Sequence, residues 1–306
     1  SGQFMVVRSV GSEQELAQMV DAGRARAGLI IPPRYAAELL GGQGAQVAFV
    51  LDGSDPSVAS SALSSARLIG QIEATNVQQA ALARRGGNVS LAPALEVRPR
   101  VWYNPDMASA IFMVPALIGL ILQMQATLLT SSAIVRERER GTIEQLIVTP
   151  IRPFELIIGK ILPYALIALL ITLEILISGT ILFGVPIKGS VLLLLGIACL
   201  FLLSTLGIGL FISTVANTQQ EAFLLTFLTL LPSIFLSGFI YPIAAMPKVL
   251  QFVSAFIPLT YFLTVVRGIV IKGVGVPALT TQIIALTIFG SILLVLASAR
   301  FRKRLD

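Results

Sequence analysis

Residue types that usually carry chemistry are scarce in this chain. Its 306 residues include no histidine and a single cysteine, Cys199, which lies in an apolar run. Disulfide bonds, Cys/His zinc sites and His-based catalytic triads are therefore excluded, and we predict neither a metal site nor a catalytic residue. The sequence also lacks G-x-x-x-x-G-K-[ST], the loop that holds ATP phosphates. We expect no cofactor on this chain, and any ATP hydrolysis would require a separate polypeptide.

One carboxylate stands where a carboxylate is costly. Glu174 lies in the middle of a long apolar run, and an ionised group at the centre of a membrane span costs several kcal/mol. Glu174 is therefore either a pathway group, or a protonated or hydrogen-bonded residue at a helix–helix contact, and the sequence leaves both open. Gln123 and Gln125 are also pathway candidates, although interhelical hydrogen bonding is the usual role of such amides.

The most informative polar segment begins at Arg136. Its charges alternate in sign from Arg136 to Arg140, directly after an apolar run, and Gly141-Thr142 then leads into an amphipathic stretch that ends near Pro150. This pattern predicts a short helix along the membrane surface, with charged side chains directed to the cytoplasm, that could receive force from a soluble partner. A solvated loop that only sets the topology is the alternative.

The composition requires a membrane around these residues. The chain is 55% hydrophobic and 12% charged, with a mean hydropathy of +0.87, whereas soluble domains carry about 25% charged residues. A span needs about 20 apolar residues. Stretches of that length occur at about 108–135, 161–183, 190–213, 222–241 and 279–299. A sixth stretch, 249–271, is interrupted by Pro258 and carries Arg267.

Basic residues set the expected topology. They are concentrated in 136–160 and at the C-terminal end, so both segments are predicted to be cytoplasmic. Five spans place both on one side, and counting 249–271 as a further span would separate them. We therefore expect a re-entrant or interfacial helical pair at 243–275. The basic excess lies in the apolar part, where orientation explains it, so no nucleic-acid partner is implied.

Residues 1–106 have a soluble composition, with nine basic and nine acidic residues. Alternating strand and helix patterns predict a small α/β domain. The expected strands are Phe4–Arg8, Ala27–Ile31, Val47–Leu51 and Leu95–Tyr103, and the expected helices are 13–22, 35–40 and 57–83. Ser12 and Glu15 form a capping box before the first helix. The predicted fold is an α-helical integral membrane protein, 107–306, with an N-terminal extracytoplasmic α/β domain, 1–106.

Several segments resemble one family. RERERGTIEQLIVTPIRPFELIIGKILPY, VANTQQEA, SGFIYPIAAMP and IPLTYFLTVVRGIVIKG are similar to the membrane part of ABC type-2 exporter permeases. GRARAGLIIPPRYAAELL and VLDGSDPSVAS resemble the large extracytoplasmic domain of a bacterial multidrug-exporter subgroup. Members of that subgroup have a further span before the outer domain, which this sequence lacks, so we expect the natural form to be longer at the N-terminus.

The resemblance implies an export function driven by a partner. It places the main ATPase-coupling residues at Arg136, Glu137, Arg138, Glu139, Arg140, Gly141, Thr142, Glu144 and Pro150, and a smaller contact at Asn217, Gln219 and Glu221. ATP and Mg would be bound by cytoplasmic ABC ATPase subunits. A second permease subunit, a periplasmic adaptor protein and the lipid bilayer are the other implied partners. The implied location is the bacterial cytoplasmic (inner) membrane, with the C-terminus cytoplasmic.

Two other functions were weighed against export of a drug-like or lipophilic substrate. The outer domain could be the working part, as a binding or adaptor-docking module that the spans anchor in the membrane. An intramembrane enzyme is disfavoured, because the spans contain no histidine, no cysteine pair and no cluster of acidic residues. The sequence does not identify the substrate, and it leaves homodimer and heterodimer equally open.

Overall fold

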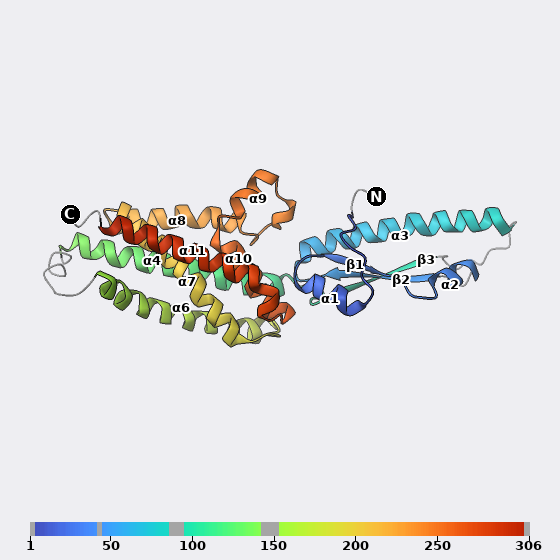
Figure 1. The fold of residues 1–306 in the computed structure, drawn as a ribbon, viewed down its shortest axis with the longest axis horizontal. Coiled ribbons are helices and arrows are strands. Elements are labelled where there is room, and N and C mark those ends of the chain that lie inside the picture. The colour runs from blue at the N-terminus through green and yellow to red at the C-terminus, as the bar shows by residue number, and fades with distance from the viewer. Residues whose placement is uncertain (1–3, 42–44, 86–94, 142–152, 303–306) are drawn as a thin grey trace. The chain divides into compact units, whose positions relative to one another are not determined.

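The computed structural model describes residues 4–41, 45–85, 95–141 and 153–302. Contacts divide the chain into two compact units, Ser1–Ser109 and Ala110–Asp306. Figure 1 shows strands only in the first of these units among the described residues, and helices in both.

The first unit is built on a three-stranded sheet with the order β1-β2-β3. Its strands are β1 (Ala27–Ile30), β2 (Ala45–Asp52) and β3 (Leu95–Trp102). The first pair is antiparallel and the second is parallel, with Val47 of β2 opposite Val97 of β3. The helices are α1 (Glu13–Asp21), α2 (Tyr35–Gly41) and α3 (Pro56–Arg85). Because parallel neighbours need a crossover, α3 connects β2 to β3.

The start of α1 confirms the predicted capping box. The Ser12 hydroxyl accepts a hydrogen bond from the Glu15 backbone N–H at 3.2 Å. The Glu15 carboxylate accepts in return from the Gly11 N–H at 3.3 Å. Beyond the cap, Leu16 and Val20 pack in a buried cluster with Val50 of β2. The cap therefore fixes where α1 begins, and its apolar side covers the sheet.

The predicted strand at Phe4–Arg8 is wrong. These residues belong to no strand or helix, and the side chains of Met5, Val6 and Val7 are largely exposed. A run of β-branched residues becomes a strand only when a neighbouring strand pairs with it and one face is buried. The described sheet supplies neither for this segment, although the Phe4 ring does contact Phe49 edge-on at 5.3 Å.

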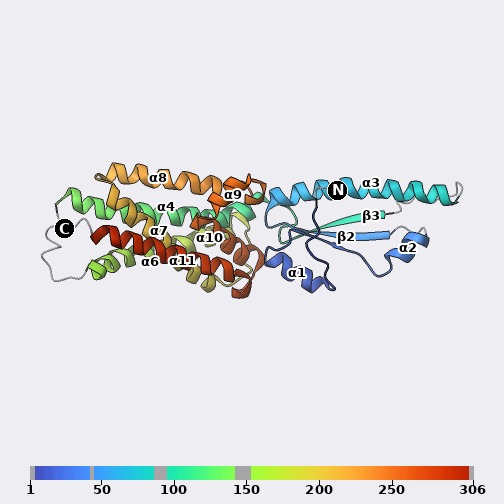
Figure 2. The same ribbon diagram turned by 45° about the horizontal axis from the view of Figure 1, so that its top comes forward.

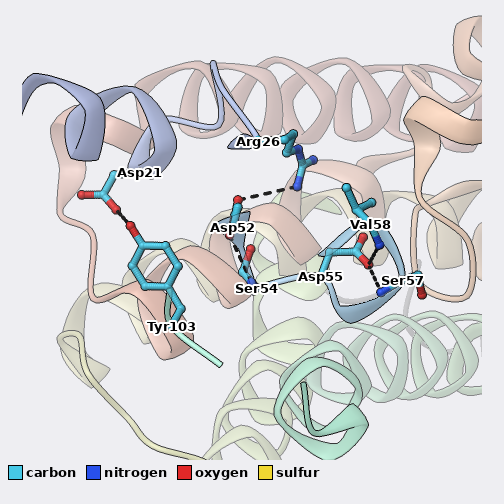
Figure 3. Close-up of polar contacts among 8 residues, drawn as sticks. All are labelled: Asp21, Arg26, Asp52, Ser54, Asp55, Ser57, Val58 and Tyr103. Carbon is cyan, nitrogen blue, oxygen red and sulfur yellow. Dashed lines mark hydrogen bonds and ion pairs between the residues drawn. The ribbon is translucent and has the colours of Figure 1, made fainter. Parts of the chain in front are cut away.

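The turn between β2 and α3 is held by two buried aspartates (Figure 3). Asp52 accepts a hydrogen bond from the Ser54 N–H at 3.1 Å. Asp55 accepts from the N–H groups of Ser57 and Val58 at 3.1 and 3.3 Å. Such bonds satisfy N–H groups that a helix leaves unpaired at its start. Asp55 thus also caps the start of α3.

The second unit contains five helices of spanning length and hydropathy among the described residues. They are α4 (Ser109–Glu139), α6 (Pro153–Phe183), α7 (Val191–Val215), α8 (Gln219–Leu236) and α11 (Val276–Arg302). By length and composition these helices are candidate spans, and they correspond to the five apolar stretches of the sequence. The ambiguous sixth stretch forms a helical pair, α9 (Lys248–Ser254) and α10 (Pro258–Arg267), with η2 (Gly268–Lys272) continuing α10. The pair is bent by 84°.

Helix α7 is the centre of the second unit. Gly207 lies against α11, where an added Cβ would be 2.8 Å from the Leu293 Cβ atom. Gly209 lies against α4, where a Cβ would be 2.8 Å from the Thr127 carbonyl oxygen. Both glycines therefore permit close helix packing.

The bent pair is seated on this core. The rings of Phe201 in α7 and Phe262 in α10 are stacked, with centroids 4.3 Å apart. Gly119 of α4 also allows Leu259 and Phe262 to approach its backbone closely. The short 3-10 turn η1 (Ile243–Ala245) precedes α9. Helix α10 is thereby fixed on α4 and α7, and its residues Leu259, Phe262 and Leu263 are almost completely buried.

Candidate functional site

The charged segment that follows the first span is part of α4. Arg136, Glu137, Arg138 and Glu139 form the last turn of that helix, so the separate surface helix predicted to begin at Arg136 is wrong for these residues. Arginine and glutamate are good helix formers, and they extend the helix beyond its apolar part. Gly141 follows with a φ of 68°, a left-handed conformation that suits glycine and ends helices.

The remaining predicted coupling residues lie at or beyond the end of α4. Arg140 and Gly141 are exposed and close the last turn, with the Gly141 N–H donating to the Arg138 carbonyl at 3.1 Å. Thr142, Glu144 and Pro150 lie outside the described residues.

The two predicted contact segments meet at the end of α4. One Nη of Arg138 donates to the Ala216 carbonyl at 3.0 Å. The Glu139 carboxylate accepts hydrogen bonds from the Gln219 backbone N–H at 2.9 Å and from its side-chain amide at 2.6 Å. We call these four residues the α4–α8 clamp. In Figure 2 it lies at the end of the second unit where α4 ends and α8 begins.

Each charge in the clamp complements the helix end that it touches. Gln219 is the first residue of α8, where free N–H groups and the helix dipole favour a carboxylate. Ala216 is the C-terminal cap of α7, where free carbonyls favour a cation. Glu139 and Arg138 therefore connect α4 to the end of one helix and the start of the next through charge-assisted hydrogen bonds.

The other predicted residues of the second segment build the turn itself. The Glu221 carboxylate accepts from the Asn217 N–H at 2.7 Å, and the Thr218 hydroxyl accepts from the Glu221 N–H at 3.2 Å. This is a capping box at the start of α8. The spacing Thr218-x-x-Glu221 before an apolar run was a signal for this helix start that our sequence analysis did not use.

A second polar link joins α4 to α8 within the bundle. Gln123 is buried, and its amide donates to the Ser233 hydroxyl at 2.9 Å. The interhelical hydrogen bond favoured for this residue is therefore present. Ser233 in turn donates to the Thr229 carbonyl at 3.0 Å. Gln125 is only partly buried. The pathway roles of Gln123 and Gln125 remain predictions.

Glu174 faces out of the described bundle. It is exposed on α6, between Leu170 and Ile177, which are each 58% exposed. A helix–helix contact within the described part of the bundle therefore does not account for this carboxylate. An ionised carboxylate at mid-span is costly where lipid covers it, and the pathway role of Glu174 remains a prediction.

Polar groups of the first unit support its fold. The Tyr103 hydroxyl donates to Asp21, and Arg26 lies 3.8 Å from the buried Asp52 (Figure 3). Burial, followed by the hydrogen bond to Asp21, raises the pKa of Tyr103, so this phenol stays neutral at physiological pH. In the described ranges no group of three or more His, Cys, Asp or Glu side chains could hold a metal.

An open cavity lies at the surface of the first unit. Its volume is about 550 Å³, and it is lined by Val7, Arg8, Glu15, Gln18, Met19 and Arg24. Arg8 and Glu15 form an exposed ion pair at 3.6 Å. The cavity combines apolar and charged walls and lies beside the exposed segment that begins at Phe4.

The apolar spans and the bent helical pair are those of a multi-pass membrane protein. The sequence model of the ABC-2 family transporter proteins matches residues 1–299, and the chain belongs to this family. Members of the family work with an ATPase partner. They are transport components, which confirms that the chain is a transport subunit rather than an enzyme.

The chain is similar to three permeases of Escherichia coli K12. It is 33% identical to the probable multidrug ABC transporter permease YbhS over 298 residues, which are 96% of this chain and 77% of YbhS. It is 30% identical to YbhR, which has the same description, over 98% of this chain and 80% of YbhR. It is 34% identical to the inner membrane transport permease YhhJ over 93% of this chain and 75% of YhhJ.

Proposed function

We propose that the chain is the permease subunit of an ABC exporter that moves a drug-like or lipophilic substrate out of the cytoplasm. ATP and Mg are bound by a separate ATPase subunit. The observation that carries the proposal is the α4–α8 clamp, because it joins the two segments that the family resemblance assigns to ATPase contact. Arg138 and Glu139 come from one segment, and Ala216 and Gln219 from the other.

The clamp lies on the cytoplasmic side in this proposal. Basic residues flank α4 at Arg136, Arg138 and Arg140, and such residues favour the cytoplasm. The outer domain is then extracytoplasmic, and the bent pair α9–α10 is a re-entrant element near the exit. The 84° bend between its halves supports a re-entrant path. The membrane is the bacterial inner membrane, in agreement with the similarity to the inner membrane transport permease YhhJ.

Transport requires that ATP change the relative stability of inward and outward states. We propose that closing of the ATPases presses on residues 136–150 and 216–221. Because Glu139 holds the first residue of α8, force on either segment reaches both α4 and α8. A second permease subunit completes the substrate route, and a periplasmic adaptor extends it beyond the membrane.

The test is a charge reversal at the contact surface. The chain is co-purified in detergent with its ATPase, with Glu137, Glu139 and Glu144 each changed to Lys. ATP hydrolysis by the complex should become independent of the permease, or the complex should not form. Glu73→Lys, an exposed charge reversal on α3, is the matched control. Normal assembly and hydrolysis in the triple variant would refute the assigned contact.

A docking role for the outer domain is the second candidate. It is favoured by the exposed side chains of Met5, Val6 and Val7, because apolar groups on a soluble unit mark interaction sites. Changing all three to Ser should abolish co-purification of an adaptor protein while leaving ATP hydrolysis unchanged. Unchanged adaptor binding would exclude this segment as the docking site.

A further inference from the structure

The C-terminal end of α8 is attached to the bent pair by hydrogen bonds. The Ser254 hydroxyl of α9 donates to the Leu236 carbonyl at 2.6 Å. Arg267 of α10 donates to the Gly238 carbonyl at 2.9 Å and approaches the Phe239 carbonyl at 3.5 Å. These acceptors are the last residue of α8 and two residues of the turn that follows it. In Figures 1 and 2, α9 lies at this end of α8.

Arg267 holds a third element as well. Its guanidinium carbon lies 3.6 Å from the ring centroid of Phe112, near the start of α4. A cation over an aromatic face is attracted by the ring quadrupole, most strongly where water is excluded. One side chain therefore connects α10, the turn after α8 and α4. Gly238, with a φ of 84°, gives this turn a conformation that few other residues adopt.

The positive charge of Arg267 is not needed to fill space between the helices. Arg267 is partly buried, and removing a guanidinium from water is costly unless it is hydrogen-bonded. An apolar side chain of similar length would fill this place without that cost. The charge instead provides bonds to two carbonyls in the turn directly after the C-terminus of α8, and a cation is favoured near such a helix end.

Helix α8 thus has polar attachments at both ends. At its start Gln219 is held by Glu139 of the clamp, and at its far end the carbonyls are held by Ser254 and Arg267. We infer that Arg267 is a positioning residue that couples α8 to the bent pair, so that a displacement of α8 imposed at the clamp reaches α9 and α10. This inference rests on the proposed function, in which the ATPases act at the clamp.

A labelling experiment on the intact permease–ATPase complex tests the coupling. Cys199→Ser removes the single native thiol, and Val249→Cys places a reporter on α9, at a side chain that is 74% exposed. The rate of reaction with a membrane-impermeant maleimide is measured without nucleotide and after trapping with ATP and vanadate. We expect the two rates to differ in the parent protein, and Arg267→Met to abolish that difference while ATP hydrolysis persists.

Two further variants separate positioning from folding. Arg267→Lys keeps the cation but not the planar fork, and should recover part of the difference in labelling. Phe112→Leu keeps the carbonyl contacts and removes the ring, and should weaken the difference without abolishing it. Lys272→Met is the matched control, since it removes a basic residue from η2, directly after α10, and should leave the difference unchanged.

The possible failures are distinguishable. If the two labelling rates still differ fully in Arg267→Met, the inference is overturned. It is also overturned if the labelling rate of the parent protein is the same with and without nucleotide although hydrolysis depends on Glu139. Loss of hydrolysis together with loss of the difference in Arg267→Met also counts against it, because the defect would then lie at the ATPase contact. If hydrolysis is insensitive to the clamp variants, the proposed function fails instead.

Discussion

Two neighbouring spans, α7 and α8, are held in the unit by different forces. Half of the most apolar part of α7 is buried within the unit, against 22% for α8. Helix α7 is fixed by close packing, with Gly207 against α11 and Gly209 against α4. Helix α8 is joined to its neighbours at polar points, among them Gln219, Ser233 and the carbonyl of Gly238.

The difference indicates which of the two can move. A tightly packed interface tolerates only discrete rearrangements, because voids and overlaps are both costly. A helix held by a few hydrogen bonds can exchange them for others at little cost, since each is worth only about 1 kcal/mol net. In the proposed mechanism, α7 is therefore the fixed core and α8 is the element that responds to the ATPase. The predictions below test this assignment in order of decreasing effect on stability.

Overpacking α7 should have the largest effect. In Gly209→Val the new side chain would overlap the Thr127 backbone and the Thr130 Cβ, which already lie 2.8 and 2.9 Å from an added Cβ. We expect a loss of about 2 kcal/mol in the free energy of unfolding, seen as a lower Tm in detergent. Gly196→Val is the control on the same helix, because no atom lies within 4 Å of its added Cβ. Equal losses would contradict the assignment.

Removing the mid-helix link of α8 should cost less. Gln123→Leu breaks the hydrogen bond to Ser233, and side-chain bonds between membrane helices are worth about 0.6 kcal/mol on average. A double-mutant cycle with Ser233→Ala, read from unfolding in mixed micelles, should give a coupling energy of about this size. A coupling well above 2 kcal/mol would show that α8 is fixed as firmly as α7.

Breaking the clamp should affect export more than stability. Glu139 and Gln219 are exposed, so Glu139→Leu should leave Tm nearly unchanged but reduce ATP-driven export several-fold. Glu139→Gln retains an acceptor oxygen for the α8 N-terminus and should lose less. Both variants are compared in the same membrane vesicles. Normal export in Glu139→Leu would remove the clamp from the mechanism.

Replacing Glu174 should have the smallest effect on stability. Its side chain faces outward from α6, so Glu174→Gln removes no hydrogen bond within the described bundle. We expect an unchanged Tm, and the predicted pathway role of this carboxylate further predicts reduced export. Leu170→Gln, on the same exposed stripe, is the control for added polarity. Full export in Glu174→Gln would make this carboxylate dispensable.

Local patterns predicted the elements of this protein better than their connections. Apolar length identified the five spans, and Pro258 marked the break in the bent pair. The strand at Phe4–Arg8 failed because strand formation depends on pairing that propensity does not reveal. The sequence did not predict that α4 extends through Glu139, because the end of an apolar run marks a membrane boundary and not necessarily the end of a helix.

The sequence predicted which segments form the candidate site, but not which residues contact one another there. The family resemblance assigned both 136–150 and 216–221 to the ATPase, yet no local signal linked Glu139 to Gln219. These residues are 80 positions apart, and tertiary packing alone brings them together. The same holds for Arg267, which the sequence presented only as a charge that interrupts an apolar stretch.

The sheet of the first unit constrains when its strands can pair during synthesis. Strand β3 pairs in parallel with β2 but follows it only after the whole of α3. Parallel pairing over such a separation forms slowly, because the connecting chain must first be ordered. The sheet is therefore incomplete until Trp102 has left the ribosome, just before α4 begins at Ser109. Biosynthesis thus leaves β2 without its parallel neighbour until α4 is about to emerge.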